Sequence, residues 1–181
     1  MKYLVISDIH GSLHGAEIIK DALQIHKADR ILALGDFLYH GPRNSLPSDY
    51  DVKDAIAILN GYKNIIIAVR GNCDAEVDQM VLEFPLTADY NAFYTGSHKI
   101  FMTHGHVYSK DHMPSLQEHD CFLYGHTHIP EAEMQNSIYM LNPGSVSIPK
   151  GGHPATYALL EDSRFTVYTL QHKEYMHIDL I

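Results

Sequence analysis

The sequence predicts an α/β protein with two β-sheets. Residues 1–74 alternate short apolar runs with amphipathic segments, a pattern typical of parallel strands joined by helices. The second half instead carries paired apolar runs around short turns, which favours antiparallel hairpins. A chain of 181 residues is long enough for one well-buried core. We therefore expect a single domain that spans residues 1–181.

Five apolar runs share one feature: each stops at a small or polar residue beside a side chain that could bind a metal. Short runs rich in Val, Ile, Leu and Phe and bounded by glycine are typical of strands that are buried on both faces. The candidate metal ligands therefore lie just past strand ends. The five runs are "YLVISDIHG", "ILALGD", "NIIIAVRGNCD", "KIFMTHGH" and "CFLYGHTH".

Two helices are expected between the first three strands. In "AEIIKDALQIHK" and "DVKDAIAILN" the apolar residues recur with helical spacing and leave one polar side. The order strand, helix, strand, helix, strand predicts parallel pairing with right-handed crossovers. Ligands beyond the carboxyl ends of such strands would share one edge of the sheet, which is where open α/β folds bind.

The second half predicts a second, more antiparallel sheet that packs against the first. "AFYTGSHKIFM" and "EAEMQNSIYML" have the pattern of hairpins around "TGS" and "QNS". The chain ends with two further strand-like stretches, "TYALLEDSRFTVYTL" and "EYMHIDLI". Residues 105–120 carry mixed signals and predict a loop with at most a short helix.

Composition limits the function. A formal net charge of -9 disfavours a broad grip on nucleic acid, so no nucleic-acid polymer is expected as a partner. The N-terminal apolar stretch ends at Asp8, too early for a signal peptide, and no run could span a bilayer. Two cysteines, Cys73 and Cys121, form no CxxC pair and fit a reducing compartment. We expect a cytoplasmic protein without membrane contact, and the sequence leaves a homo-oligomer open.

The polar residues behind the five strands together predict a metal centre. Each of them alone could be a turn or cap residue. Core packing does not require so many ligand-type side chains at successive strand ends, but a pair of divalent ions about 3.5–4 Å apart does. The residues concerned are Asp8, His10, Asp36, Asn72, His104, His106, His126 and His128.

The motifs "DIHG", "GD", "GNCD", "THGH" and "GHTH", in this order, resemble the calcineurin-like metallophosphoesterase superfamily. The stretches "GPRN", "VRGNCD" and "NPGSVSIPKGG" resemble the bacterial YfcE-type phosphodiesterases more closely. The resemblance implies a four-layer αββα sandwich of two mixed sheets flanked by helices. It also implies a binuclear, metal-dependent phosphodiesterase that hydrolyses a small phosphodiester by in-line attack of a metal-bridging hydroxide.

The resemblance also implies which residues bind the metals. One ion would lie on Asp8, His10, Asp36 and His128, and the second on Asp36, Asn72, His104 and His126, with Asp36 bridging. His106 matches no ligand of the family, and we interpret it as a supporting residue. Mixed nitrogen and oxygen ligands favour Mn, Fe, Zn, Co or Ni over Mg or Ca. The resemblance suggests two Mn(II) ions.

Cys73 departs from the family pattern, since many members carry histidine at this position. We interpret the thiol as a spacer or weak acid rather than a nucleophile, and a soft metal ligand is the third option. Arg43 and Asn44 follow Asp36 on its loop and could bind a phosphoryl oxygen; a salt bridge or a simple turn is the alternative. Lys150 is interpreted as a solvated loop residue.

Two other functions compete with the enzyme. Some superfamily members, notably a retromer subunit, have lost ligands and act as protein-interaction scaffolds; here every ligand position is filled, which favours catalysis. A metallo-β-lactamase-like site in "HGHVYSKDH" is disfavoured, because Asp111 and His112 come too late for the compact HxHxDH spacing.

Overall fold

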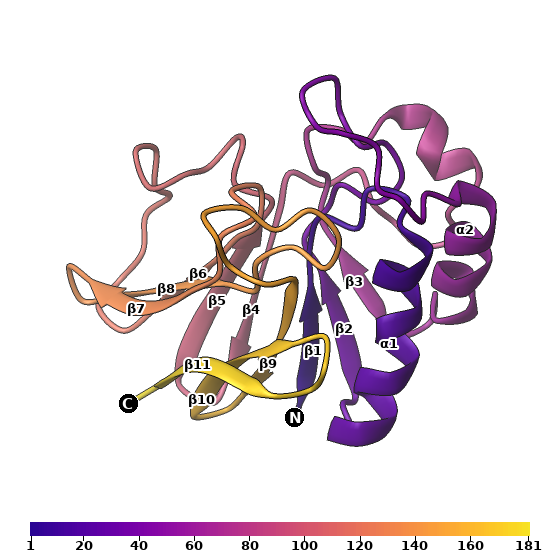
Figure 1. The fold of residues 1–181 in the computed structure, drawn as a ribbon. Coiled ribbons are helices and arrows are strands. Elements are labelled where there is room, and N and C mark those ends of the chain that lie inside the picture. The colour runs from indigo at the N-terminus through magenta and orange to yellow at the C-terminus, as the bar shows by residue number, and fades with distance from the viewer.

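In the computed structural model, which describes residues 1–181, two mixed β-sheets lie face to face and helices cover one of them (Figure 1). The first sheet has six strands in the order β11-β10-β9-β1-β2-β3. They are β1 (Tyr3–Ile6), β2 (Arg30–Ala33), β3 (Ile66–Ala68), β9 (Thr156–Glu161), β10 (Arg164–Thr169) and β11 (Glu174–Asp179). The second sheet has five, in the order β4-β5-β6-β8-β7. They are β4 (Tyr90–Thr95), β5 (His98–Thr103), β6 (Cys121–Leu123), β7 (Glu131–Gln135) and β8 (Ile138–Asn142).

The first half of the chain folds as the sequence predicts. Strands β1, β2 and β3 pair in parallel, and α1 (Leu13–His26) and α2 (Val52–Gly61) make the two crossovers. Ser12 caps α1 by accepting a hydrogen bond from the backbone N–H of Gly15 at 2.9 Å. A short 3-10 helix, Glu76–Met80, follows β3. None of these helices combines the length and the hydrophobicity that crossing a membrane requires.

The second sheet differs from the prediction in two ways. Its three central strands are parallel, and the last strands of the chain, β9, β10 and β11, join the first sheet instead of the second. Both expected hairpins form, β4 with β5 and β7 with β8, but β5, β6 and β8 run in the same direction. The chain reaches β6 from β5 through the long segment 104–120, and β7 lies outside β8 at the edge of the sheet. The five strands that precede the candidate ligands therefore do not share one sheet. Three of them, β1, β2 and β3, belong to the first sheet, and β5 and β6 belong to the second.

Side chains on both faces of the first sheet are buried. On β1, Leu4 and Ile6 contact the core under the helices, whereas Tyr3 and Val5 contact the core between the sheets. This alternation follows from the two-residue period of a strand. The N-terminus lies at the lower end of β1 in Figure 1, so the loops after the parallel strands gather along the upper edge.

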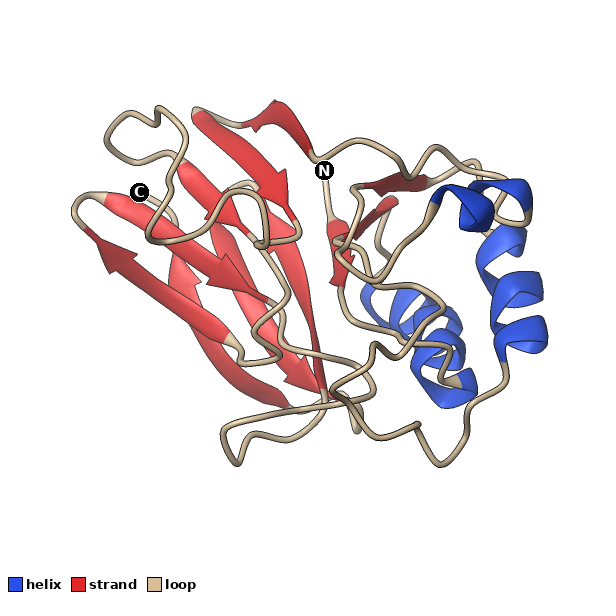
Figure 2. Cartoon of the chain, turned by 90° about the horizontal axis from the view of Figure 1, so that it is seen from above, coloured by secondary structure: helices blue, strands red, loops and turns tan.

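The outer face of the second sheet is covered by a loop. Phe101, Phe122 and Met140 on this face contact Tyr108 and Leu116 of the segment 104–120, which contains no helix. Figure 2 shows all helices on one side of the molecule. The predicted α/β class with two mixed sheets is confirmed. Helices cover only the first sheet, and this loop takes the place of the helical layer that was expected over the second.

A tyrosine on β9 links the first sheet to the end of α1 and to the turn before β11 through two histidines. The buried hydroxyl of Tyr157 on β9 lies 2.7 Å from Nε2 of His26, the last residue of α1. It also lies 2.8 Å from Nδ1 of His172, in the turn before β11. One hydroxyl can donate to one ring and accept from the other, so it joins the helix end to the turn.

We expect Tyr157→Phe to lower the free energy of unfolding by about 1–3 kcal/mol, because both histidines lose their partner in a half-buried place. Urea denaturation at neutral pH measures this. Tyr175→Phe is the matched control, since Tyr175 bonds His153 at 2.9 Å at an exposed position and should change stability by less than about 0.5 kcal/mol. Equal losses in the two variants would contradict the assignment.

Candidate metal centre

The loop after β1 holds Asp8 and His10 in unusual backbone conformations. Their φ angles are 57° and 51°, in the left-handed region that residues other than glycine rarely adopt. The carbonyl oxygen of Asp8 accepts hydrogen bonds from Ser145 and Ser147 at 2.9 and 2.8 Å. The backbone N–H of His10 donates to the carbonyl of Asp36 at 2.9 Å. Neighbouring loops thus hold a strained conformation, as is common at functional sites.

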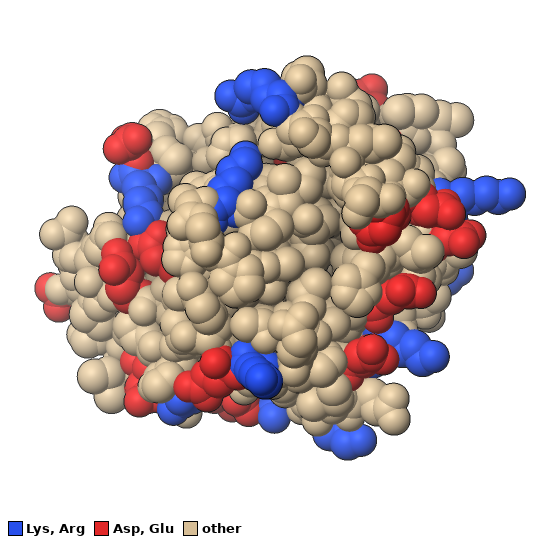
Figure 3. Space-filling model, viewed as in Figure 1, with Lys and Arg blue, Asp and Glu red and all other residues tan.

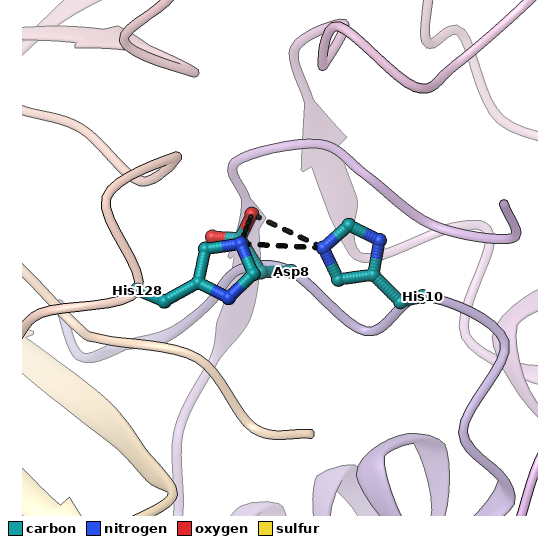
Figure 4. Close-up of side chains that lie close together, drawn as sticks. All are labelled: Asp8, His10 and His128. Atoms are coloured by element: carbon teal, nitrogen blue, oxygen red, sulfur yellow. Dashed lines mark hydrogen bonds and ion pairs between the residues drawn. The ribbon is translucent and has the colours of Figure 1, made fainter. Parts of the chain in front are cut away.

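One carboxylate oxygen of Asp8 has partners and the other has none. Oδ2 accepts from the Ser7 hydroxyl at 2.6 Å and from the backbone N–H of His126 at 3.1 Å. Oδ1 is buried and accepts no hydrogen bond. Nε2 of His128 lies 3.2 Å from this oxygen and Nε2 of His10 lies 3.6 Å from it (Figure 4).

The second nitrogen of each of these rings faces a backbone carbonyl. Nδ1 of His10 lies 2.7 Å from the carbonyl oxygen of Tyr39, and Nδ1 of His128 contacts that of Ile148. A ring nitrogen in this position carries the proton, so Nε2 presents its lone pair to the centre. The two Nε2 atoms are only 3.4 Å apart and lie beside the unpaired oxygen of Asp8. Three acceptors that converge without a donor call for a cation.

Asp36 joins this group to a second one. Its Oδ2 lies 3.7 Å from Nε2 of His10 and 3.4 Å from Nε2 of His104. Its Oδ1 accepts from the backbone N–H of Cys73 at 2.8 Å. A Cβ atom on Gly71 would lie 2.0 Å from that oxygen, so the approach of the two loops requires glycine there. Asp36 therefore lies between the two groups, and its predicted bridging role stays a prediction.

The second group contains His104, Asn72 and His126. Nδ1 of His104 lies 2.7 Å from the carbonyl of Leu34, so its Nε2 also faces the centre. This Nε2 lies 3.1 Å from the side-chain oxygen of Asn72. The half-buried ring of His126 lies 5.1 Å from that of His104, between centroids. The structure thus places the seven side chains that the resemblance implies as ligands around one centre, although His126 belongs to none of the close donor groups.

The spacing of the donors fits a metal ion. Donors bound to one ion at about 2.0–2.2 Å lie roughly 3–3.5 Å from each other. The distances from Asp8 Oδ1 and Asp36 Oδ2 to the ring nitrogens run from 3.2 to 3.7 Å. Three sets of three side chains each keep their ligand atoms within 4.8 Å of one another. The sets are Asp8, His10 and His128; Asp8, Asp36 and His104; and His10, Asp36 and Cys73.

The electrostatics of the centre favour positive charge. Burial raises the pKa of Asp8, but the adjacent rings of His10 and His128 and the nearby His104 hold this pKa well below its usual range. Burial lowers the pKa of His104, but the Asp36 carboxylate and the charge of Asp8 raise it to about 9. Without a metal ion, a proton on His104 would therefore supply the positive charge that balances the two carboxylates.

His106 lies beside the centre but outside it. Its ring centroid is 5.3 Å from that of His104, and its buried Nδ1 has no hydrogen-bond partner. Burial and the nearby His104 and His126 lower its pKa to about 4. The ring is thus a neutral neighbour of the ligands, and its predicted role as a supporting residue stays a prediction.

A cavity of about 430 Å³ opens over the centre. Asp36, Asn72, His126 and His128 line it together with further residues of their own loops and one residue of the loop after β8. The other lining residues are Gly41, Pro42, Arg43, Asn44, Cys73, Thr127 and Lys150. Figure 3 shows basic side chains over the upper loops and acidic ones along the left, lower and right margins of this face.

The loop after Asp36 places both predicted substrate contacts at this cavity. Arg43 forms no salt bridge, so that alternative for Arg43 is wrong. The side-chain amide of Asn44 donates to the carbonyl of His40 at 2.8 Å and supports the loop. Lys150 is exposed, as expected of a solvated residue, but it also lines the cavity.

Cys73 is half-buried between the centre and this loop. Its Sγ lies 3.2 Å from the amide nitrogen of Asn72, and a Cβ atom on Gly41 would lie 3.0 Å from it. Burial, together with the Asp36 carboxylate, raises the pKa of the thiol to about 12. A neutral thiol is a poor nucleophile and no cation. The spacer, weak-acid and soft-ligand interpretations remain predictions.

Sequence reasoning missed the role of Asp74, the last residue of "GNCD". This buried carboxylate accepts hydrogen bonds from the backbone N–H groups of Asp36 and Phe37, both at 2.8 Å, and of Gly71 at 2.7 Å. It thereby ties the loop after β2 to the loop after β3. A carboxylate next to a Gly-Asn turn was the available signal, but the same pattern is also typical of a solvated turn.

The "NPGS" turn lies beside the ligand edge, as predicted, and supports two ligand loops. The amide of Asn142 donates to the carbonyl of Gly125 and to the hydroxyl of Thr127, at 3.0 and 3.1 Å. Ser145 bonds the backbone of Asp8. The loops of the second sheet are therefore fixed to those of the first.

Comparison with known proteins identifies the class. A model of the calcineurin-like phosphoesterase superfamily domain matches residues 1–164, so the chain belongs to this superfamily. The predicted family, its metallophosphoesterase class and the α/β fold are confirmed. Membership implies divalent metal ions, and the structure contains side-chain groups that can hold them.

Particular relatives extend the match. Phosphodiesterase YfcE of Escherichia coli (strain K12) is 45% identical over 170 residues, which cover 94% of this chain and 92% of the relative. The probable metallophosphoesterase YsnB of Bacillus subtilis is 29% identical over 167 residues, or 88% and 83% of the two chains. A solved structure of the E. coli YfcE phosphoesterase covers 100% of both chains with a TM-score of 0.97 and 42% identity. Vps29 of Entamoeba histolytica with bound zinc, at 23% identity, covers 100% of both chains with a TM-score of 0.64 and shares the fold.

We expect Asp74→Asn to lower the free energy of unfolding by about 1–3 kcal/mol, because an amide cannot accept all three buried N–H bonds. Metal affinity should fall as well, since Asp36 loses its fixed position. Thermal unfolding and metal titration measure the two effects. Asp78→Asn is the matched control, because Asp78 accepts one backbone N–H, that of Ala75, at an exposed position. A variant Asp74→Asn as stable as this control would contradict the role of Asp74.

Proposed function

We propose that this chain is a phosphodiesterase that hydrolyses a small phosphodiester with two bound divalent metal ions. The observation that carries the proposal is the buried Asp8 Oδ1, which lacks a donor and faces the lone pairs of His10 and His128. Membership of the phosphoesterase superfamily and the name of the E. coli relative, a phosphodiesterase, support the reaction.

Seven residues would hold the ions. Asp8, His10 and His128 would bind one, Asn72, His104 and His126 the other, and Asp36 both. Two ions held by these residues would lower the pKa of coordinated water toward neutrality and would polarise the phosphoryl oxygens of the ester. The chain itself fixes the rings of His10, His104 and His128 through their Nδ1 hydrogen bonds. The carboxylates of Asp8 and Asp36 each accept one backbone N–H.

Charge explains how an acidic protein would bind a phosphate ester. Two divalent ions carry a charge of about +4, and the shell returns two negative charges from Asp8 and Asp36. The centre is therefore a local positive site in a chain of net charge -9. Arg43 adds a cation on the cavity wall and could bind one phosphoryl oxygen through two parallel bonds.

Two hollows beside the centre favour a diester over a monoester. The first is the cavity that contains Arg43. The second, about 400 Å³, is lined by His106, Ser109, Lys110 and others, and shares His126 and Thr127 with the first. A phosphodiester carries two ester arms on one phosphorus, and each hollow has room for one. Cys73 at the site supplies no strong acid, which favours esters with good leaving groups.

Mn(II) is our proposal for the resident metal. The shell mixes imidazole nitrogen with carboxylate and amide oxygen, which suits Mn, Fe, Co, Ni or Zn better than Mg or Ca. The competing scaffold function has less support, because every ligand position carries a side chain able to bind metal. The likeness to Vps29 extends to the fold alone.

Reconstitution tests the reaction. Metal-stripped protein loaded with Mn(II), Ni(II), Co(II), Zn(II) or Mg(II) is assayed with an aryl phosphodiester and the matching monoester. We expect hydrolysis with the transition metals, fastest with Mn(II), and a higher kcat/KM for the diester, because two hollows accept two arms. Faster turnover of the monoester with every metal would refute the diester assignment.

Metal content tests the bridging role of Asp36. We expect Asp36→Ala to bind neither ion, since both lose a shared carboxylate, and Asn72→Ala to keep about one ion per chain. Elemental analysis after gel filtration gives the stoichiometry, and circular dichroism verifies the fold of both variants. One full equivalent of metal in Asp36→Ala would show that Asp36 does not bridge.

A further inference from the structure

The cavity over the metal centre is unusually polar for a small-molecule site. Only one of the 11 residues that line it is hydrophobic. Sites for apolar ligands are lined mainly by hydrophobic and aromatic side chains. Arg43 and Lys150 are the two basic residues of the lining, and neither forms a salt bridge. The ester arm that enters this cavity should therefore be polar or anionic.

Lys150 is held in place by both of its backbone polar groups. Its N–H donates to the carbonyl of His128 at 3.2 Å, and its carbonyl accepts from the N–H of His153 at 3.1 Å. Gly151 and Gly152 follow with φ angles of 65° and 78°, which let the chain turn directly after the lysine. The side chain thus starts from a fixed point beside a metal ligand.

Arg43 enters the cavity from a different loop. The segment from His40 to Asn44 follows β2 and contacts Cys73 through Gly41, whereas Lys150 follows β8 and is tied to His128. Arg43 suffices to bind the phosphoryl group that the metals attract. Lys150 is a second cation without a partner, in a protein that has 22 acidic residues. Such a cation attracts an anionic group of the ligand.

Building on the phosphodiesterase function proposed above, we propose that Lys150 binds a second anionic group, a carboxylate or a phosphate, on the ester arm in this cavity. The substrate class is then a phosphodiester with an anionic arm. Lys150 determines specificity between arms, whereas Arg43 and the metals act on the phosphoryl group shared by all substrates.

Two synthetic diesters test this inference. Both carry 4-nitrophenol as the leaving group; the second arm is phenyl in one and 4-carboxyphenyl in the other. Because the leaving group is the same, the ratio of their kcat/KM values reports recognition of the arm. We expect the metal-loaded wild type to prefer the carboxylated diester by about fivefold, the size of one hydrogen-bonded charge pair at a partly exposed site.

Variants locate the cause of the preference. Lys150→Gln should remove this preference while the metal content stays unchanged, and Lys150→Glu should reverse the preference. Arg43→Gln should lower kcat/KM for both diesters alike. Lys53→Gln is the matched control, since Lys53 is an exposed lysine of α2 without a salt bridge and away from the cavity. A preference that persists in Lys150→Gln would overturn the assignment.

Two measurements on the wild-type protein also test whether charge causes the preference. The preference should shrink as the ionic strength rises from 0.02 to about 0.5 M, because salt screens the charge pair. In calorimetric titration, 4-carboxyphenyl phosphate should bind more tightly than phenyl phosphate. If the phenyl diester is cleaved but neither preference appears, this inference fails and the phosphodiesterase function stands. If no diester is cleaved with any metal, the phosphodiesterase function itself fails.

Discussion

A buried carboxylate oxygen without a donor is the constraint around which the site is built. Leaving such an oxygen unpaired in a protein interior costs several kcal/mol unless a cation is nearby. Here the lone pairs of His10 and His128 point at Asp8 Oδ1, so the protein supplies more acceptors in place of a donor. The left-handed backbone of Asp8, His10, Asp36, His126 and His128 is strain that these loops maintain. These strained conformations would serve to direct the donor atoms of the loops at a bound cation.

The centre lies where the loops of two sheets meet, and the supports cross that junction. Ser145, from the loop after β8 of the second sheet, bonds the backbone of Asp8 in the first. Nδ1 of His104, after β5, bonds the carbonyl of Leu34, after β2. Asp74 fastens the loops after β2 and β3 to each other. Such bonds preorganise the donors, which lowers the cost of assembling them around an ion.

The sequence predicts those parts of the fold that short-range sequence patterns determine. Apolar runs, glycines and helical spacing specify the parallel half of the first sheet, both hairpins and the positions of the candidate ligands at the strand ends. The direction of the central strands of the second sheet is not local: it depends on where segment 104–120 crosses, and that segment has no periodic pattern. The contacts of Asp74 and the place of Lys150 at the cavity could not be predicted either, because an aspartate or a lysine in an ordinary solvated turn has the same local sequence. Only their tertiary neighbours distinguish them.

Crystals grown with Mn(II) and measured at the manganese absorption edge test the central claim most directly. We predict two anomalous peaks about 3.5–4 Å apart, one beside Asp8 Oδ1, His10 and His128 and one beside His104 and Asn72, both in contact with Asp36. A map without a peak beside Asp8 Oδ1, from crystals that contain manganese, would contradict the claim that this oxygen and the two facing rings exist to bind a metal ion.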